Sequence, residues 1–135
     1  MTIEQLNVYR GVCANVDSIK MQIDSLYVPV SSPNGKRIIG SSGFIPGNPT
    51  EQAVSRIIRL KEELNEQLTL QFNLLNEITE WLNEVADTDP EVAALIRFHY
   101  VIGLSWKETA VKAYGYNAGH SRARKRVFRY FGRVN

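Results

Sequence analysis

The sequence predicts an all-α fold in which a long N-terminal helical hairpin is followed by a C-terminal helix-turn-helix module. Apolar residues recur at steps of three and four along most of the chain, which is the period of an amphipathic helix. A stretch rich in proline and glycine separates two long segments of this kind, and a helix-capping motif followed by a glycine turn divides the last third into short helices. With 135 residues, the chain accommodates one domain, or one small module with an accessory arm.

The first helical segment is predicted over residues 3–28, where apolar side chains recur on one side of a helix. It ends at a stretch from Pro29 to Pro49 that holds four of the five prolines and four of the nine glycines. Each proline lacks a backbone donor and clashes with the preceding helical turn, so we expect a long loop at residues 29–49. The residues of the first apolar face are Leu6, Tyr9, Cys13, Val16, Ile23 and Tyr27.

A second, longer helix is predicted from a cap at Thr50 to about Val85, with apolar residues in a heptad pattern. A helix of about 35 residues is near 50 Å long, so the first helix covers only part of its apolar stripe. An antiparallel hairpin within one chain is the simpler interpretation. We favour a hairpin that also self-associates into a dimer or tetramer, because no other core covers the remaining apolar face. The candidate oligomerisation residues are Ile57, Leu64, Leu68, Leu75, Ile78 and Leu82.

The sequence Asp-Thr-Asp-Pro at residues 87–90 predicts the end of the long helix and the start of a new one, since proline is favoured in the first turn of a helix. We expect the new helix to run from Glu91 to Gly103, where the glycine ends it. The chain therefore divides into an N-terminal oligomerisation arm, residues 1–86, and a C-terminal module, residues 87–135.

Two further helices, with a glycine turn between them, are predicted in the module. Ser105 and Glu108 form a capping box, in which each side chain accepts a hydrogen bond from the backbone amide of the other residue. The helix that follows is expected to span residues 106–113. After the turn, a last helix is expected over residues 118–131, with Asn117 as its N-cap. Two short helices joined in this way are typical of a helix-turn-helix.

Charge is distributed unevenly along the chain. Residues 1–87 carry seven basic and eleven acidic side chains, whereas residues 88–135 carry nine basic and three acidic ones. From Tyr116 to the last residue there are six Lys or Arg and no acidic residue. A basic C-terminal third favours a polyanionic partner. Together with the helix-turn-helix pattern, it favours double-stranded DNA over the simpler interpretation of a solvated basic helix.

The last helix has one apolar and one polar face, and this assigns roles to its side chains. The face expected in the core holds Ala123, Val127, Tyr130 and Phe131, with His120 at its edge, so DNA would meet the opposite face. Residues near the N-terminus of a recognition helix reach base edges, while later ones usually meet phosphates. The base-reading candidates are Asn117, Ser121, Arg122 and Lys125, and the phosphate candidates are Arg124, Arg126, Arg129 and Arg133.

Catalysis, metal binding and cofactor binding are not expected. The sequence holds no glycine-rich phosphate loop in a strand–helix context and no set of nucleophile, base and acid. Cys13 is the single cysteine, and His99 and His120 have no cluster of metal-ligating residues beside them, so all three are expected to pack. No apolar run approaches the ~20 residues that span a bilayer, and the N-terminus lacks a signal-peptide pattern. We therefore expect a cytoplasmic protein without a membrane partner.

The residues before and within the capping motif resemble a known family. The run from Ala94 to Ala110 is similar to region four of sigma factors, where a helix ends in aromatic-x-x-Gly-Leu-Ser/Thr and the next begins with Trp/Tyr-x-Glu-x-Ala. The chain as a whole resembles small transcriptional regulators of the ArpU and RinA type from bacteriophages of Gram-positive bacteria. The resemblance is specific over about residues 92–131. It implies Ser105–Ala113 as supporting helix, Asn117–Phe131 as recognition helix, and activation of late genes as the function.

Three functions compete. A sequence-specific transcription regulator would oligomerise through the arm, place paired basic helices in successive major grooves, and contact RNA polymerase through the acidic arm. A DNA-packaging subunit of the small-terminase kind also joins a helix-turn-helix to oligomerisation helices, and it predicts a ring larger than a dimer, which eight or more copies in solution would favour. A protein-binding scaffold with a solvated basic tail predicts no affinity for DNA at moderate salt. We favour the regulator, encoded by a phage and acting in the cytoplasm of a bacterial host.

Overall fold

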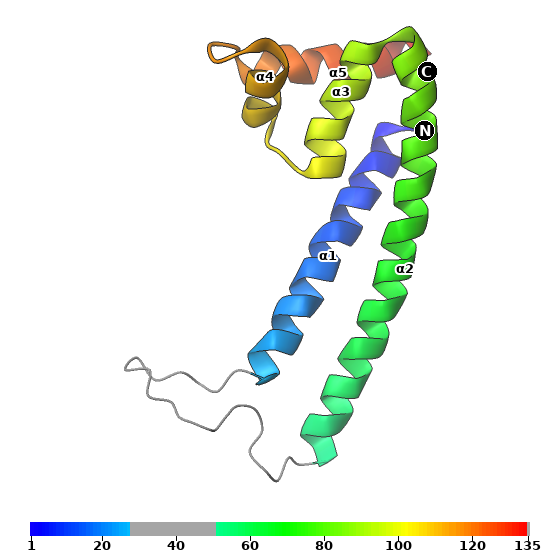
Figure 1. Cartoon of the computed structure of the whole chain (residues 1–135), viewed down its shortest axis with the longest axis vertical. Helices are drawn as coiled ribbons and strands as arrows, with labels where there is room; N and C mark the ends of the chain where they lie inside the picture. Colours follow the sequence, from blue (N-terminus) through cyan, green and yellow to red (C-terminus); the bar gives the residue numbers. More distant parts are fainter. Residues whose placement is uncertain (28–50, 135) are drawn as a thin grey trace. The chain divides into compact units, whose positions relative to one another are not determined.

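A computed structural model describes residues 1–27 and 51–134, except for the side chains of residues 27, 133 and 134. Within these ranges the fold is all-α, as the sequence predicts, and contains no strand (Figure 1). The predicted loop at residues 29–49 and the predicted Thr50 cap lie outside the described residues. The elements are α1 (Ile3–Tyr27), α2 (Glu51–Thr88), α3 (Pro90–Ile96), the π-helix η2 (Arg97–Ile102), α4 (Trp106–Tyr114) and α5 (His120–Val134).

The chain divides into two compact units. One contains Met1–Val12 and Gln71–Asn135, and the other contains Cys13–Leu70. This division differs from the one expected after residue 86, because α2 from Gln71 onward belongs with the short C-terminal helices. Both long helices therefore contribute residues to both units.

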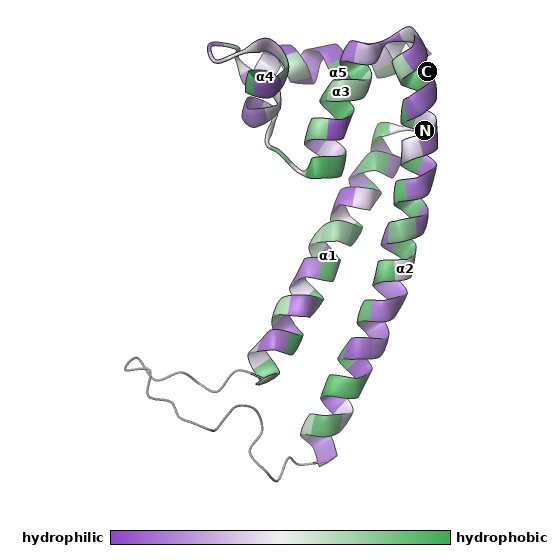
Figure 2. Ribbon diagram, in the orientation of Figure 1, coloured by the Kyte–Doolittle hydropathy of each residue, from purple (hydrophilic) through white to green (hydrophobic). Residues whose placement is uncertain are grey.

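In the unit Cys13–Leu70, the second part of α1 packs against the first part of α2. Ile19 and Ile23 of α1 form a buried cluster with Leu60 of α2. The same two helices are joined by a hydrogen bond from Asn15 Nδ2 to Gln67 Oε1 (3.1 Å). Hydrophobic and hydrophilic residues alternate along both helices in the manner that a one-sided apolar stripe requires (Figure 2). The two apolar stripes bury each other.

In the other unit, the start of α1 and the end of α2 share a core with the short helices. Among the short helices, α3, α4 and α5 pack against one another in pairs. Trp81 of α2 stacks on Phe131 of α5 with 5.9 Å between the ring centroids, which links a long helix to a short one. The buried hydrophobic residues of this unit are Leu6, Tyr9, Val12, Ile78, Leu82, Val85, Val92, Ala93, Leu95, Ile96, Tyr100, Ala110, Ala123, Val127 and Phe131.

The residues predicted to join copies of the chain lie instead on the side of α2 that packs within its own chain. Ile57, Ile78 and Leu82 are buried within a single chain, and Leu64 packs against the Ile19–Ile23–Leu60 cluster. Ile57, Ile78 and Leu82 are therefore already enclosed by their own chain, whereas Leu64 is half-buried. The simpler of the two interpretations, an antiparallel hairpin, accounts for the heptad pattern. The two remaining candidates, Leu68 and Leu75, are half-buried.

The helix predicted to end at Gly103 has two parts. Its start is capped by Asp89, whose Oδ1 accepts a hydrogen bond from the Val92 amide (3.2 Å). Its second part, Arg97–Ile102, winds as a π-helix, the wider form with bonds between residues five apart. Gly103 then ends the helix at φ 97°, a left-handed conformation that glycine adopts without a steric penalty. The end of this helix is therefore at the predicted residue.

The predicted capping box at the start of α4 is present. Ser105 Oγ accepts a hydrogen bond from the Glu108 amide (3.1 Å), and the Ser105 amide donates to Glu108 Oε1 (2.9 Å). The bond from the Ser105 amide to the carboxylate is the main cause that holds the pKa of Glu108 below its ordinary value, and the Ser105 side chain adds to it, because both stabilise the charged form. The helix starts at Trp106, directly after the cap, as the sequence predicts.

The turn before α5 is longer than predicted, and the prediction of Asn117 as N-cap is wrong. α4 is followed by Gly115 at φ 108°, again a backbone conformation that favours glycine. The Ala118 amide then donates to the Gly115 carbonyl (3.2 Å), which closes a turn that contains Asn117. As a result, α5 begins at His120 and not at Ala118. Asparagine is favoured in turns as well as at N-caps, and here Asn117 lies in the turn.

Leu82→Ala is expected to lower the free energy of unfolding by about 2–5 kcal/mol, because it leaves a cavity where a large side chain is fully packed. The side chain of Leu82 is 2% exposed, whereas that of Leu70, also on α2, is 41% exposed. The matched control Leu70→Ala is therefore expected to cost less than about 1 kcal/mol. Chemical denaturation followed by circular dichroism measures both values, and equal losses would contradict the packing described for α2.

Candidate nucleic-acid interface

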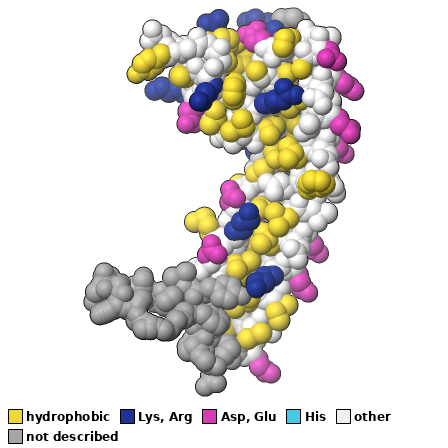
Figure 3. Space-filling model, in the orientation of Figure 1, with side chains coloured by type: hydrophobic (Ala, Val, Ile, Leu, Met, Phe, Trp, Pro, Cys, Tyr) yellow, Lys and Arg dark blue, Asp and Glu magenta, His cyan; other side chains and the backbone are white. Residues whose placement is uncertain are grey.

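α5 separates its buried and its exposed side chains onto two faces. Ala123, Val127 and Phe131 recur every fourth residue and are buried. In Figure 3, Lys and Arg side chains lie over the region of the short helices, and Asp and Glu side chains line much of α2. The predicted division of the last helix into a core face and a polar face is therefore confirmed. The exposed side chains of α5 up to residue 129 are His120, Ser121, Arg122, Arg124, Lys125, Phe128 and Arg129.

Five of the eight predicted DNA-contacting residues line one groove. The groove has a volume of about 460 Å³ and is formed by α5 together with the start of α3 and the end of α4. Asn117 and Arg124 are exposed outside it, and the side chain of Arg133 lies outside the described part of the chain. The residues that line the groove are Glu91, Tyr114, Ser121, Arg122, Lys125, Arg126 and Arg129.

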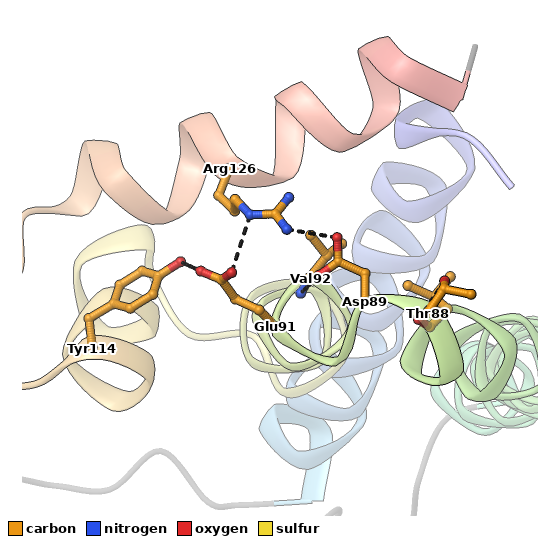
Figure 4. Close-up of polar contacts among 7 residues, drawn as sticks. Thr88, Asp89, Glu91, Val92, Tyr114 and Arg126 are labelled. Atoms are coloured by element: carbon orange, nitrogen blue, oxygen red, sulfur yellow. Dashed lines mark hydrogen bonds and ion pairs between the residues drawn. The ribbon is translucent and has the colours of Figure 1, made fainter.

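Arg126 does not present a free charge to this groove. Its Nη2 lies 2.7 Å from Asp89 Oδ2, and its Nε lies 3.2 Å from Glu91 Oε1 (Figure 4). The hydrogen bond to Asp89 is the main cause that raises the pKa of Arg126 above its ordinary value. Two carboxylates at the start of α3 already hold the guanidinium, so Arg126 is not placed to bind a phosphate as the sequence predicted. Its role is to join α3 to α5.

Glu91 also binds Tyr114, the last residue of α4. The Tyr114 hydroxyl donates a hydrogen bond to Glu91 Oε2 (Figure 4). Burial, and then this bond, raise the pKa of Tyr114 to about 12, so the phenol is protonated at neutral pH. The sequence did not single out either residue, because they are 23 positions apart and no local pattern joins them.

Arg122 lies over the aromatic ring of Tyr114. Its Cζ is 3.9 Å from the ring centroid, which is a close cation–π contact. Lys125 and Arg129 follow Arg122 at three and seven residues, so they share its side of the helix. The three cationic side chains form a row along the groove, and all three are exposed.

Arg124 lies outside the row, over a second aromatic ring. Its Cζ is 4.9 Å from the centroid of the Phe128 ring, and that ring meets Trp106 edge-on at 6.4 Å. Phe128 thus lies against α4, although the residue is 40% exposed. Arg124 remains a phosphate candidate beside the groove.

His99 is the centre of a buried contact among α1, η2 and α4. Its Nδ1 lies 2.7 Å from the Leu104 carbonyl oxygen, which can only accept, so Nδ1 carries the proton. Nε2 then accepts a hydrogen bond from Arg10 Nη1 (3.0 Å), and the imidazole stacks on Trp106 at 3.7 Å between centroids. Burial lowers the pKa of His99; the bond to Leu104 opposes this shift, and the Arg10 charge adds to it. His99 is therefore neutral, and it packs as the sequence predicts, whereas His120, which was also expected to pack, is exposed.

The free energy of unfolding is expected to fall as the pH is lowered from about 7 to about 5. In the unfolded chain His99 protonates near its ordinary pKa of about 6.5, whereas the folded protein lowers that pKa. The unfolded state therefore binds the proton first. The stability contributed by neutral His99 is complete above the ordinary pKa and is lost as the pH falls toward the folded one. The slope from this one proton is at most about 1.4 kcal/mol per pH unit.

The variant His99→Phe separates this titration from packing, because it keeps an aromatic ring against Trp106 and has no ionisable group. It is expected to be less stable than the wild type at pH 7, since the Leu104 carbonyl and Arg10 lose a partner. Its stability is also expected to change less between pH 7 and pH 5. Urea denaturation at a series of pH values measures the slope, and the same slope in both proteins would rule out His99 as its source.

Within residues 1–27 and 51–134, no group of three or more His, Cys, Asp or Glu is placed to bind a metal ion. In the same ranges, no helix combines the length and the apolar composition that crossing a bilayer requires. No protein-family model, curated protein or solved structure matches the chain. Function is therefore inferred from the residues of the groove and their geometry.

Proposed function

We propose that this chain is a sequence-specific transcription regulator whose α5 enters the major groove of double-stranded DNA. The observation that carries the proposal is the row of exposed cationic side chains, Arg122, Lys125 and Arg129, on a helix that follows a capped helix and a glycine turn. The major groove is about 12 Å wide and admits an α-helix. The opposite face of α5 packs on α3 and α4, which would hold the helix against DNA.

The exposed face of α5 differs from that of an ordinary solvated helix, because its positive charges have no carboxylate on the same helix to neutralise them. No acidic residue follows Glu108 in the chain, so α5 has no carboxylate of its own. Glu91, which lines the groove from α3, is engaged by Arg126 and by the Tyr114 hydroxyl. A phosphate backbone that approaches α5 would therefore meet free cations and release its condensed counterions, which drives non-specific affinity.

Position along α5 separates base-reading from phosphate-binding roles. Ser121 and Arg122 are in the first turn of the helix, where side chains of a recognition helix reach base edges. Arg129 is two turns further along, where contacts to phosphate are usual. The proposed base-reading residues are Asn117, Ser121, Arg122 and Lys125, and the proposed phosphate-binding residues are Arg124 and Arg129.

We further propose that the regulator acts as a dimer or tetramer in the cytoplasm of a bacterial host. Two-fold symmetry would place two copies of α5 in half-sites about 34 Å apart. The similarity of Ala94–Ala110 to region four of sigma factors favours a contact with RNA polymerase and activation of phage late genes. Copies would have to meet through residues other than the buried side of α2, where Ile57, Ile78 and Leu82 lie.

The proposal is tested by incubating the purified full-length chain with sheared DNA of its source genome at ~150 mM salt and sequencing the retained fragments. Enrichment of short, imperfectly palindromic sites upstream of an operon is expected. Enrichment beside a packaging gene, away from any promoter, would favour the small-terminase kind of function instead. No enrichment, with binding lost uniformly as salt rises, would contradict sequence-specific recognition.

Arg129→Ala is expected to weaken binding to the selected site and to unrelated DNA by the same factor, and to reduce the slope of log K against log salt by about one unit. Arg59→Ala serves as the matched control, because it removes the same charge from an exposed position of α2. Affinities measured by fluorescence anisotropy at several salt concentrations give both slopes. A loss confined to the selected site would instead assign Arg129 to base reading.

A further inference from the structure

We infer that Tyr114 is a positioning residue that makes Arg122 the reader of a guanine base. The inference rests on the proposed function, because it names what the groove beside α5 recognises in DNA. Its basis is a contact between a side chain of α4 and a side chain of α5. The last residue of α4 carries the ring on which an arginine of the first turn of α5 lies.

The stack limits the directions in which the Arg122 guanidinium can bind. The group is planar, and its five N–H donors point outward within that plane. The Tyr114 ring centroid lies 3.9 Å from Cζ, so a partner cannot approach the guanidinium from the side of the ring and must meet the donors at the edge that points away from it. A fitting partner therefore presents two acceptors side by side to that edge.

Tyr114 itself is held at both ends. Its backbone belongs to the last turn of α4, and its hydroxyl donates to Glu91. Glu91 in turn accepts a hydrogen bond from Arg126 Nε (3.2 Å), whose Nη2 donates to Asp89 (2.7 Å). Because each side chain in this series is fixed by the next, the ring is a rigid support for Arg122.

Guanine fits this arrangement better than a phosphate does. N7 and O6 of guanine are adjacent acceptors in the major groove, and bidentate binding by arginine is their commonest specific contact. A phosphate also offers two oxygens, but every nucleotide carries one, so a fixed direction toward phosphate would not distinguish one DNA sequence from another. An arginine that is already ordered loses less rotamer freedom on binding, which increases the gain from a base of the right geometry.

The test measures discrimination at single base pairs of the selected DNA site by fluorescence anisotropy. The wild-type chain is expected to bind a site with one particular G·C pair replaced by A·T about 5- to 150-fold more weakly. Replacing that guanine by 7-deazaguanine, which lacks the N7 acceptor, is also expected to weaken wild-type binding. Arg122→Ala is expected to abolish both effects at that position while other positions keep their preference.

Tyr114→Leu is expected to reduce discrimination at the same guanine by about 2- to 5-fold, the range of an exposed cation–π contact. Tyr114→Phe keeps the ring and should retain more of the discrimination than Tyr114→Leu. The double variant Tyr114→Leu/Arg122→Ala should behave as Arg122→Ala alone, because Tyr114 acts only through Arg122. Tyr116→Leu is the matched control, since this tyrosine is 85% exposed in the turn and does not line the groove.

Three results would overturn the inference and leave the proposed function standing. The first is unchanged discrimination in Tyr114→Leu, and the second is losses that multiply in the double variant. The third is an Arg122→Ala variant that loses affinity equally for all sequences with a smaller salt slope, since Arg122 would then bind phosphate. A wild-type chain without any sequence preference would overturn both proposals. Thermal unfolding of every variant establishes that each is folded at the assay temperature.

Discussion

Arg126 lies between two carboxylates at the start of α3, 2.7 Å from Asp89 and 3.2 Å from Glu91, and so links the middle of α5 to the first turn of α3. Asp89 is also the N-cap of α3, where its Oδ1 accepts a hydrogen bond from the Val92 amide. One carboxylate therefore both caps α3 and pairs with Arg126 of α5. Carboxylates are favoured at a helix N-terminus, where unpaired amides carry partial positive charge. Removing Arg126 would leave the partly buried carboxylate of Asp89 without its cationic partner, which is costly for a charge held away from water.

The same group determines which charges of the groove beside α5 are free. Without Arg126, Glu91 would place a negative charge with no cationic partner of its own in a groove whose other charged residues are Arg122, Lys125 and Arg129. With it, Glu91 becomes the acceptor that holds Tyr114, and Tyr114 becomes the support for Arg122. A count of basic residues along α5 therefore overstates the charge offered to a partner, because one arginine acts in folding.

The packing of the hairpin of α1 and α2 is governed by the wide apolar stripe on α2, which has to be buried. One side of that stripe is buried by α1 and, toward the C-terminal end, by the short helices, as Ile78 and the Trp81–Phe131 stack illustrate. A heptad pattern records that a helix has an apolar partner along its length. It does not record whether that partner is another part of the same chain or a second copy, because both bury the same positions.

Sequence by itself determined the features that depend on neighbouring residues. Helical periodicity located the long and the short helices, and the Ser105–Glu108 capping box was predictable because both partners are three residues apart. Only the tertiary structure decided the role of Arg126, the support of Arg122 by Tyr114 and the burial of the α2 heptad residues. Asp89 and Arg126 are 37 positions apart, and Glu91 and Tyr114 are 23 apart, so no local pattern could pair them. The start of α5 was only partly predictable from the sequence, because Asn117 suits a cap and a turn equally. The positive-φ conformation of Gly115 places Asn117 in the turn.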